Sequence, residues 1–187
     1  MAVNSVYLSI ASNINPEANI YKATLELSQT CNIVAVSRCF VTDAIPAPDQ
    51  PPTKDLPYYI NCVALVETNV EAEALKFDVL RPLEAQLGRV RTTDKYAPRP
   101  MDLDILLFNE DVIQQENLAI PDKDIRKRWF LAQGIADIKP ELILPDTNES
   151  LASILQPLLD DFYAKGESFR EDNELRQKML AIAKFSC

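Results

Sequence analysis

Four segments in the first part of the chain are rich in apolar and β-branched side chains, which is typical of β-strands. In the third of them Tyr59, Asn61, Val63 and Leu65 share one face, because successive side chains of a strand point to opposite faces. The fourth is apolar after its second carboxylate, so we expect burial on both faces. The expected strands are Val3–Ser12, Ile33–Thr42, Tyr58–Glu67 and Asp102–Phe108.

Two segments between these strands carry apolar residues at helical spacing. The first begins with Asn15-Pro16-Glu17, a cap followed by a proline and an acid, and predicts a helix to about Gln29. The second predicts a helix from a cap in Thr68-Asn69 through Leu87-Gly88, where the glycine ends it. Pro82 inside this helix predicts a kink or an altered turn.

The second half of the chain predicts shorter elements. A tight turn at Asn109-Glu110-Asp111 leads into Val112-Ile113, which suggests a hairpin with the strand before it. Gly166 separates the last two helices. The remaining expected elements are an extended piece at Leu118–Pro121, a helix at Leu131–Ile138, a short strand or turn at Leu142–Pro145, an amphipathic segment at Ser150–Tyr163 broken by Pro157, and a last helix at about Asn173–Lys184.

The order β-α-β-β-α-β up to Phe108 predicts an α+β fold, a ferredoxin-like sandwich with an antiparallel sheet and helices packed on it. Residues 1–147 are expected to form this domain, and residues 148–187 a C-terminal helical extension that packs on or extends it. Ala44–Pro57 contains too much proline for a helix or a central strand, so we expect a long, stiffened loop there.

Composition excludes several kinds of function. The net charge of −9 argues against nucleic-acid or anionic-membrane partners. The absence of histidine excludes a Ser-His triad, a histidine base and histidine metal ligands. Three glycines provide no glycine-rich phosphate loop, so side chains would have to hold any phosphates. The four cysteines show no CxxC spacing, and no apolar stretch reaches spanning length, so we expect a cytoplasmic protein with buried thiols.

The candidate chemistry lies at the start of the fourth strand. Asp102 and Asp104 are two residues apart, so both carboxylates point to one face and could hold a hard cation such as Mg²⁺. A basic segment leads into them, and its guanidinium groups suit phosphate oxygens. Alternatively, the basic segment is a solvated loop and the two aspartates are an ordinary strand start. The basic residues are Arg89, Arg91, Lys95 and Arg99.

Several short motifs, in order along the chain, resemble one family. The most specific are Leu87-Gly88-Arg89-Val90-Arg91 and Pro98-Arg99-Pro100-Met101-Asp102-Leu103-Asp104-Ile105. Tyr59-Ile60-Asn61 and Arg128-Trp129-Phe130 also fit. With these motifs, the stretch from the first strand to about Asp146 resembles 6-hydroxymethyl-7,8-dihydropterin pyrophosphokinase of folate biosynthesis.

This resemblance implies an enzyme that transfers pyrophosphate from ATP to the pterin hydroxymethyl group and releases AMP. It implies two Mg²⁺ ions on Asp102 and Asp104, and a possible association with neighbouring folate-pathway enzymes. It places catalytic roles on Arg89, Arg91, Arg99, Asp102 and Asp104. For ATP it implies Arg91, Arg99, Ile105, Asp122, Lys123 and Arg128, and for the pterin Thr42, Asp43, Ile45, Tyr59, Asn61, Glu84, Asp102 and Phe130. Tyr59 and Phe130 would sandwich the pterin ring; on the residues alone they could equally be core aromatics.

The sequence departs from the family pattern at several positions. Ala11 stands where the family usually has glycine, and Lys95-Tyr96-Ala97 where it usually has Arg-Trp-Gly. Asp122 stands where the family usually has a histidine, and an ionised carboxylate cannot donate a hydrogen bond. Either Lys123 supplies a cation instead, or turnover is reduced. Two alternatives therefore remain: a non-catalytic relative that binds pterin or nucleotide or acts as a scaffold, and an unrelated ferredoxin-like interaction domain.

Overall fold

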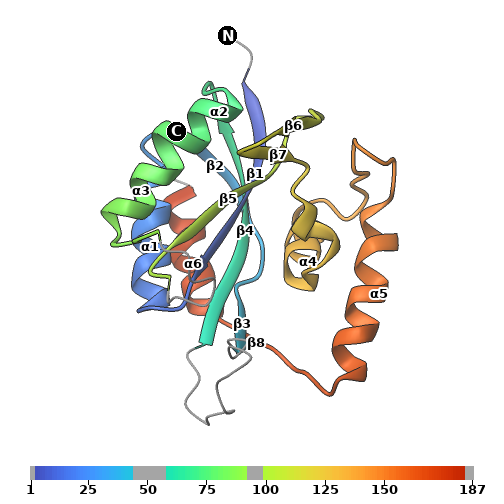
Figure 1. Cartoon of the computed structure of the whole chain (residues 1–187). Helices are drawn as coiled ribbons and strands as arrows, with labels where there is room; N and C mark the ends of the chain where they lie inside the picture. The colour runs from blue at the N-terminus through green and yellow to red at the C-terminus, as the bar shows by residue number, and fades with distance from the viewer. Residues whose placement is uncertain (1–2, 44–57, 92–98, 184–187) are drawn as a thin grey trace.

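Six strands form one antiparallel sheet in the computed structural model, which describes residues 3–43, 58–91 and 99–183. The spatial order is β5-β1-β4-β3-β8, and β2 also pairs with β4. β4 is the longest strand and lies at the centre of the sheet, with β1 on one side and β2 and β3 on the other (Figure 1). The strands are β1 (Asn4–Ser12), β2 (Asn32–Val36), β3 (Phe40–Asp43), β4 (Tyr58–Thr68), β5 (Asp102–Phe108) and β8 (Arg170–Glu171).

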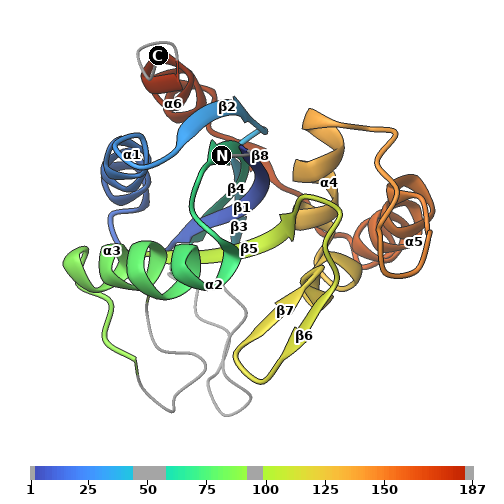
Figure 2. The ribbon, with the colours of Figure 1, turned by 90° about the horizontal axis from the view of Figure 1, so that it is seen from above.

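Helices cover both faces of this sheet. Figure 2 shows α1, α2, α3 and α6 on one side and α4 and α5 on the other. One face carries α1 (Pro16–Leu27), α2 (Ala72–Ala74), the π-helical segment η1 (Leu75–Leu80), α3 (Arg81–Gln86) and α6 (Asn173–Ala183). The other carries α4 (Trp129–Ile138) and α5 (Leu151–Ala164), which follow the small hairpin β6 (Ile113–Gln115) and β7 (Leu118–Ile120) and the 3₁₀ turn η2 (Lys123–Arg126).

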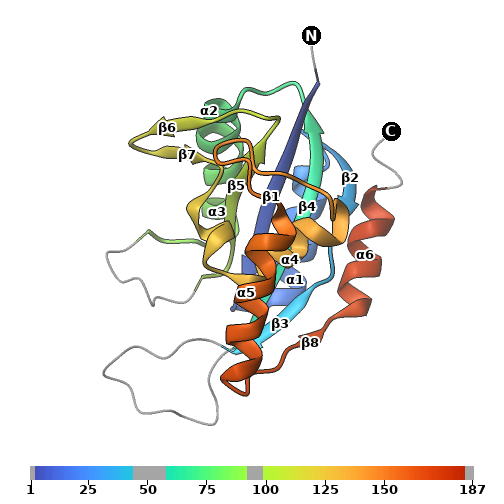
Figure 3. The same ribbon diagram turned by 90° about the vertical axis from the view of Figure 1, so that its right-hand side faces the viewer.

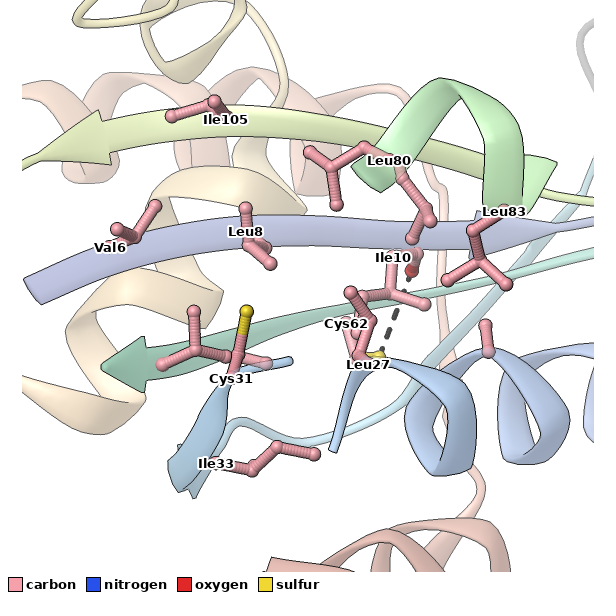
Figure 4. Close-up of a cluster of buried hydrophobic side chains, with 14 of the residues drawn as sticks. Val6, Leu8, Ile10, Leu27, Cys31, Ile33, Cys62, Leu80, Leu83 and Ile105 are labelled. Atoms are coloured by element: carbon pink, nitrogen blue, oxygen red, sulfur yellow. Dashed lines mark hydrogen bonds between the residues drawn. The ribbon is translucent and has the colours of Figure 1, made fainter. Parts of the chain in front are cut away.

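Each face of the sheet has its own apolar core. Leu8 and Ile10 of β1 pack with Leu27, Leu80 and Leu83 in the first core, as Figure 4 shows. On the opposite face, side chains of β4 and β5 pack under α4 and α5 in the second core; they include Val63, Leu106, Ala132, Ile135 and Leu151. Full burial of such a side chain contributes about 1.5–3 kcal/mol. The sheet is therefore held from both sides, which keeps the strand ends in fixed positions.

The predicted α+β class and three of the four predicted strands are confirmed, with β5 matching its expected bounds. The prediction of one strand over Ile33–Thr42 is wrong, because β2 ends at Val36 and β3 begins at Phe40. The Ser37 hydroxyl accepts a hydrogen bond from the Val63 N–H at 2.9 Å. The Arg38 N–H donates to Asp137 Oδ2 at 3.0 Å instead of to a strand. Side chains thus replace part of the backbone ladder and interrupt the strand.

The two predicted helix caps are wrong in their chemistry. Asn15 precedes Pro16 as expected, but its φ is 41° and its side chain forms no cap hydrogen bond. Thr68 is the last residue of β4, and the second helix begins only at Ala72. The predicted altered turn is confirmed: with proline at 82, the Arg81 N–H bonds to the Lys76 carbonyl in a π-helical turn. Gly88, at φ 91°, ends the helix as predicted.

Two predictions for the second half are wrong. Ile113 pairs with Ile120 in a separate two-stranded sheet and not with the preceding strand. Asn109, at φ 49°, exchanges hydrogen bonds with the Ser5 backbone and turns the chain away from the sheet. α5 is continuous across Pro157, because its buried face against α4 outweighs one missing helical hydrogen bond.

The last helix and the separation at Gly166 are confirmed, whereas β8 was not predicted. The expected loop at 44–57 lies outside the described residues. Of the basic segment, residues 92–98 lie outside them too, and these include Lys95. In the described parts of the chain, every helix is too short or too polar to cross a bilayer.

Candidate active site

A cavity of about 120 Å³ opens beside the start of β5. Its walls come from β1, β4, β5 and the segment that runs from Asp122 into α4. Because β1 lies between β4 and β5, the cavity sits at the end of three adjoining strands. Its lining residues are Ser9, Ile10, Ala11, Asn61, Cys62, Arg99, Asp102, Asp104, Leu106, Asp122, Asp124, Arg128, Phe130 and Leu131.

The predicted carboxylate pair faces this cavity. Asp102 lies opposite Ala11 and Asp104 opposite Ser9 in the pairing of β5 with β1, and all four residues line the cavity. The intervening Leu103 and the following Ile105 are 3% exposed and belong to the first core, on the other face. Strand alternation therefore aims both carboxylates into one space, with an apolar anchor behind them.

Asp102 is bound by two arginines. It accepts a hydrogen bond from Arg89 and one from Arg99 Nη1, the latter at 2.6 Å. Arg89 also donates to Glu84 of α3, and Arg91 Nη2 donates to Glu84 at 2.6 Å. Two carboxylates and three arginines thus form one continuous network at the mouth of β5.

Glu84 is the buried member of this network, with 1% of its surface exposed. Burial raises the pKa of its carboxyl group, and the Leu103 N–H, Arg89 and Arg91 oppose that rise. The Leu103 N–H donates to Glu84 Oε1 at 2.8 Å, which ties α3 to β5. Glu84 therefore holds two of the predicted catalytic arginines against the strand that carries the aspartates.

Asp104 lies in surroundings that are mostly negative. Its pKa is raised to about 6, mainly by burial and also by the nearby Asp102, Asp122 and Glu84 carboxylates, while Lys76 lowers it. Such a carboxylate gains most from a bound cation, because a cation both neutralises it and relieves the repulsion. The electrostatics at Asp104 therefore fit a positively charged ligand.

The donor set fits a hard divalent ion that also binds phosphate. Within residues 3–43, 58–91 and 99–183, no cluster of three or more His, Cys, Asp or Glu side chains is placed to hold a metal. A cation at Asp102 and Asp104 would therefore complete its shell with water and substrate oxygens. Mg²⁺ is commonly bound in this way, by one or two carboxylates plus phosphates.

The start of β5 is fixed to the end of β1 by residues that the sequence reasoning missed. Asn13 Oδ1 accepts from the Arg99 N–H at 2.7 Å, and the Asn13 N–H donates to the Arg99 carbonyl at 3.1 Å. The Ser12 hydroxyl donates to the Pro100 carbonyl at 2.7 Å. The polar pair at the end of β1, Ser12-Asn13, was the available signal. These bonds place Arg99 beside the carboxylates.

Of the predicted pterin residues on β3, β4 and α4, Asn61 and Phe130 line another wall of the cavity, whereas Thr42 and Tyr59 lie outside its lining. The buried Asn61 side chain lines the cavity, and its Nδ2 donates to Thr42 Oγ1 at 3.0 Å. Tyr59 is half-buried, and burial raises the pKa of its hydroxyl, with Arg99 and Asp102 as charged neighbours. Phe130 lines the cavity and contacts Trp129 edge-on, with ring centroids 5.8 Å apart.

The remaining predicted residues divide between cavity and surface. Asp122 and Arg128 line the cavity, and Arg128 Nε forms an ion pair with Asp124 at 3.1 Å. Burial raises the pKa of Asp122. Asp43 and Lys123 are exposed, and Ile105 lies in the first core and not in the cavity. Ile45 lies outside the described residues. Ser9 and Asp124 were not predicted, although Ser9 follows from the alternation along β1.

The fold and the cavity together define a class of protein: an α+β sandwich whose carboxylates and arginines meet at a strand mouth, suited to binding and transferring phosphate groups. Comparison with known sequences then identifies the family. Residues 7–140 match the sequence profile of 7,8-dihydro-6-hydroxymethylpterin-pyrophosphokinase (HPPK). The chain belongs to this family.

Individual relatives agree with the profile. The chain is 34% identical over 148 residues to the 2-amino-4-hydroxy-6-hydroxymethyldihydropteridine pyrophosphokinase of Pseudomonas aeruginosa, covering 77% of this chain and 86% of that protein. The protein of the same name from Haemophilus influenzae is 33% identical over 146 residues, 76% of this chain and 86% of its own length. The folic acid synthesis protein fol1 of Pneumocystis carinii is 31% identical, but this chain covers 20% of it.

Solved structures share the fold. Plasmodium falciparum HPPK-DHPS, in a crystal with pterin and p-hydroxybenzoate, superposes with a TM-score of 0.67 at 13% identity. The superposition covers 88% of this chain and 43% of that one. This chain therefore spans less than half the length of that solved protein, and at this identity the likeness concerns the fold alone.

Proposed function

We propose that this protein transfers the pyrophosphoryl group of ATP to the hydroxymethyl group of 6-hydroxymethyl-7,8-dihydropterin, giving AMP and the pterin diphosphate. Membership of the HPPK family supports the reaction. The observation that carries the proposal is the meeting of Asp102 and Asp104 with Arg99 and Arg128 around one cavity. Phosphoryl transfer of this kind depends on positioning and charge neutralisation, which such groups provide without a histidine.

In this proposal Asp102 and Asp104 hold two Mg²⁺ ions. When bound, these ions neutralise and orient the phosphates of ATP. The chain's own arginines act beside them: Arg99 and Arg128 bind phosphate oxygens, and Arg89 and Arg91 stabilise charge on the transferred group. Support comes from the raised pKa of Asp104 and from the network that holds Arg89 and Arg91 next to Asp102.

The pterin is assigned to the wall formed by β4 and α4. Tyr59 and Phe130 stack on its flat ring, and the Asn61 amide binds its edge, where a donor and an acceptor are both needed. The bond from Asn61 to Thr42 supports this role because it fixes the amide orientation. The contributions of Asp43, Ile45, Glu84 and Asp102 to the pterin site, and of Ile105 and Lys123 to the ATP site, remain predictions.

Asp122 places a carboxylate on the side of the cavity that also carries Asp124 and Arg128. Its carboxylate lines the cavity and accepts from the Asp124 N–H at 2.7 Å, so it is held as an acceptor. We propose that the lysine next to it, Lys123, supplies the cation on this side. Lys123→Ala is then expected to raise the KM for ATP several-fold with little change in the KM for the pterin.

The experiment that tests the function is detection of AMP from ATP, Mg²⁺ and fresh hydroxymethyldihydropterin. Wild-type protein is expected to form AMP, and the rate of AMP formation by Asp104→Ala is expected to be at least about 10²-fold lower. Asp111→Ala, an exposed aspartate on the turn after β5, is the matched control and is expected to retain full activity. No AMP from wild-type protein would refute the proposal, and tight pterin or nucleotide binding without AMP would favour the non-catalytic alternative.

We further propose the finer assignments. The order of the strands in the sheet, together with the helices that connect β1 to β2 and β4 to β5, supports a ferredoxin-like classification. In this division residues 1–147 form the domain and residues 148–187 its extension. Relatives named folate synthesis bifunctional protein occur in Chlamydia caviae and Arabidopsis thaliana, which supports association with another folate-pathway enzyme. The buried free thiols of Cys31, Cys39 and Cys62 are compatible with a reducing cytoplasm.

A further inference from the structure

The C-terminal extension, which follows the residues matched by the family profile, packs against the elements that form the proposed pterin wall, β4 and α4, and against β3 beside them. The match ends at residue 140, and the chain then forms α5, β8 and α6. Figures 1 and 3 show it descending along α5, passing beside β3 as β8, and rising as α6 on the opposite face of the sheet. β8 pairs with β3, with Phe40 opposite Glu171 and Val41 opposite Arg170. The extension thus becomes part of the sheet.

An aromatic cluster joins the extension to the wall. Phe169, just before β8, lies edge-on to Phe40 with ring centroids 5.4 Å apart, and 4.8 Å from Trp129. Phe162 of α5 lies 4.7 Å from Trp129. Phe40 and Trp129 contact each other at 5.2 Å. Two rings from the extension therefore enclose one ring of β3 and one of α4.

Both enclosed rings are directly linked to residues of the proposed pterin site. Phe40 of β3 is 0% exposed and lies opposite Asn61 in the pairing with β4. Trp129 precedes Phe130 in α4 and contacts its ring edge-on. The position of the Asn61 strand and the angle of the Phe130 ring thus both depend on packing that the extension completes.

Polar contacts hold the extension in the same place. Arg38, in the break between β2 and β3, binds Asp137 of α4 at 2.8 Å and Glu171 of β8 at 3.0 Å. The Asp172 N–H donates to the Cys39 carbonyl at 2.9 Å, and Arg176 Nε donates to the Ser37 carbonyl at 3.0 Å. These contacts connect β8 both to the segment before β3 and to α4. A shift of β8 would therefore also move β3 and α4.

We propose that Phe169 is a positioning residue for the pterin site, acting through Phe40 and Trp129 on Asn61 and Phe130. The assignment rests on the proposed function, because it takes Asn61 and Phe130 as pterin contacts. On the ATP side, Asp102, Asp104 and Arg99 lie on β5 and its approach, away from this cluster. Arg128 directly precedes Trp129, but its guanidinium is held by the ion pair with Asp124. Loss of the Phe169 ring is therefore expected to weaken pterin binding selectively and to leave ATP binding unchanged.

The test compares steady-state kinetics of Phe169→Ala with those of wild-type protein. The KM for the pterin is expected to rise on the order of tenfold, as loss of the ring contacts with Phe40 and Trp129 implies, with the KM for ATP within about twofold. Phe169→Tyr keeps a ring at this position and is expected to restore the wild-type KM. Ile182→Ala is the matched control: it removes a buried side chain from the same extension, but in the first core on the opposite face.

A second measurement separates this inference from the proposed function. Trp129 is the only tryptophan, so its fluorescence reports the state of the wall directly. Phe169→Ala is expected to shift its emission to longer wavelength, and Ile182→Ala is not. If wild-type protein forms no AMP, the proposed function is refuted. An unchanged Trp129 emission in Phe169→Ala overturns the positioning role, whether or not the wild-type protein forms AMP. Equal increases in both KM values, or none, also overturn it.

Discussion

At the scale of single residues, the site combines carboxylates that oppose one another with arginines that hold them in place. Asp104 shows this repulsion most clearly, because burial and the neighbouring carboxylates together raise its pKa to about 6. A buried carboxyl with a raised pKa destabilises the folded state once it ionises. The free protein therefore stores unfavourable charge at the place where the proposed cation binds.

This charge predicts a pH dependence of stability. Since the folded pKa of Asp104 is about 6, above the ordinary value of 3.8, its contribution is fully favourable below pH 4 and is lost as the pH rises through 6. Without divalent metal, Asp104→Asn is therefore expected to raise the free energy of unfolding by about 1–3 kcal/mol at pH 8 and by little at pH 4. Thermal unfolding in a chelating buffer measures this, with Asp111→Asn as control. Equal gains at both pH values would contradict it.

Burial raises the pKa of Glu84 as it does that of Asp104, but the Glu84 carboxylate has hydrogen-bond partners in the fold. Its carboxylate accepts from Arg89, from Arg91 and from the Leu103 N–H, and removal of a buried partner leaves the others unpaired. Glu84→Gln is expected to lower the free energy of unfolding by about 2–4 kcal/mol at pH 7. Urea denaturation provides the measurement, and Glu110→Gln, on an exposed turn, is the comparison. A loss below about 0.5 kcal/mol would show that solvent replaces the network.

At the scale of elements, the contact between α4 and β4 fixes the positions of the two elements that form the proposed pterin wall. Gly134 of α4 faces Val63 of β4 so closely that an added Cβ would lie 2.5 Å from Val63 Cγ2. No side chain fits there without movement of the helix or the strand. The glycine thus sets the distance between the helix that carries Phe130 and the strand that carries Asn61.

Gly134→Ala is accordingly expected to destabilise the protein by about 1–3 kcal/mol, although alanine favours helix by about 1 kcal/mol. Val63→Ala in the same chain should restore part of the loss by making room. A double-mutant cycle from chemical denaturation measures the coupling, expected to exceed about 0.5 kcal/mol. If Gly134→Ala proves as stable as wild-type protein, the helix is free to move, and the contact does not set the distance.

The elements also show what a sequence can and cannot predict. The spacing of Asp102 and Asp104 was enough to place both carboxylates on one face, because strand alternation is a local rule. The break between β2 and β3 depends on Asp137, 99 positions away from Arg38, and no local pattern contains it. The bond from Arg99 to Asn13 likewise spans 86 positions. Local periodicity predicts the elements, and long-range side-chain contacts decide where they end.

At the scale of the whole molecule, the site is a mixed region on an acidic protein. The chain has 28 acidic residues and 19 basic ones, and the cavity itself contains Asp102, Asp104, Asp122 and Asp124 beside Arg99 and Arg128. A triphosphate entering alone would meet strong repulsion from these carboxylates. A triphosphate that enters together with a divalent cation would meet much less, so the proposed site favours the two as a unit.

This coupling predicts a thermal shift that needs both ligands. At about 100 times its dissociation constant, Mg²⁺ with ATP is expected to stabilise wild-type protein by about 2.7 kcal/mol, a rise of several degrees in Tm for a chain of this size. ATP with a chelator should give only a small part of that rise, and Asp104→Ala should abolish the Mg²⁺-dependent part. Asp111→Ala should keep it. An equal shift by ATP without metal would show that the arginines alone hold the phosphates, and the carboxylate pair would then need another role.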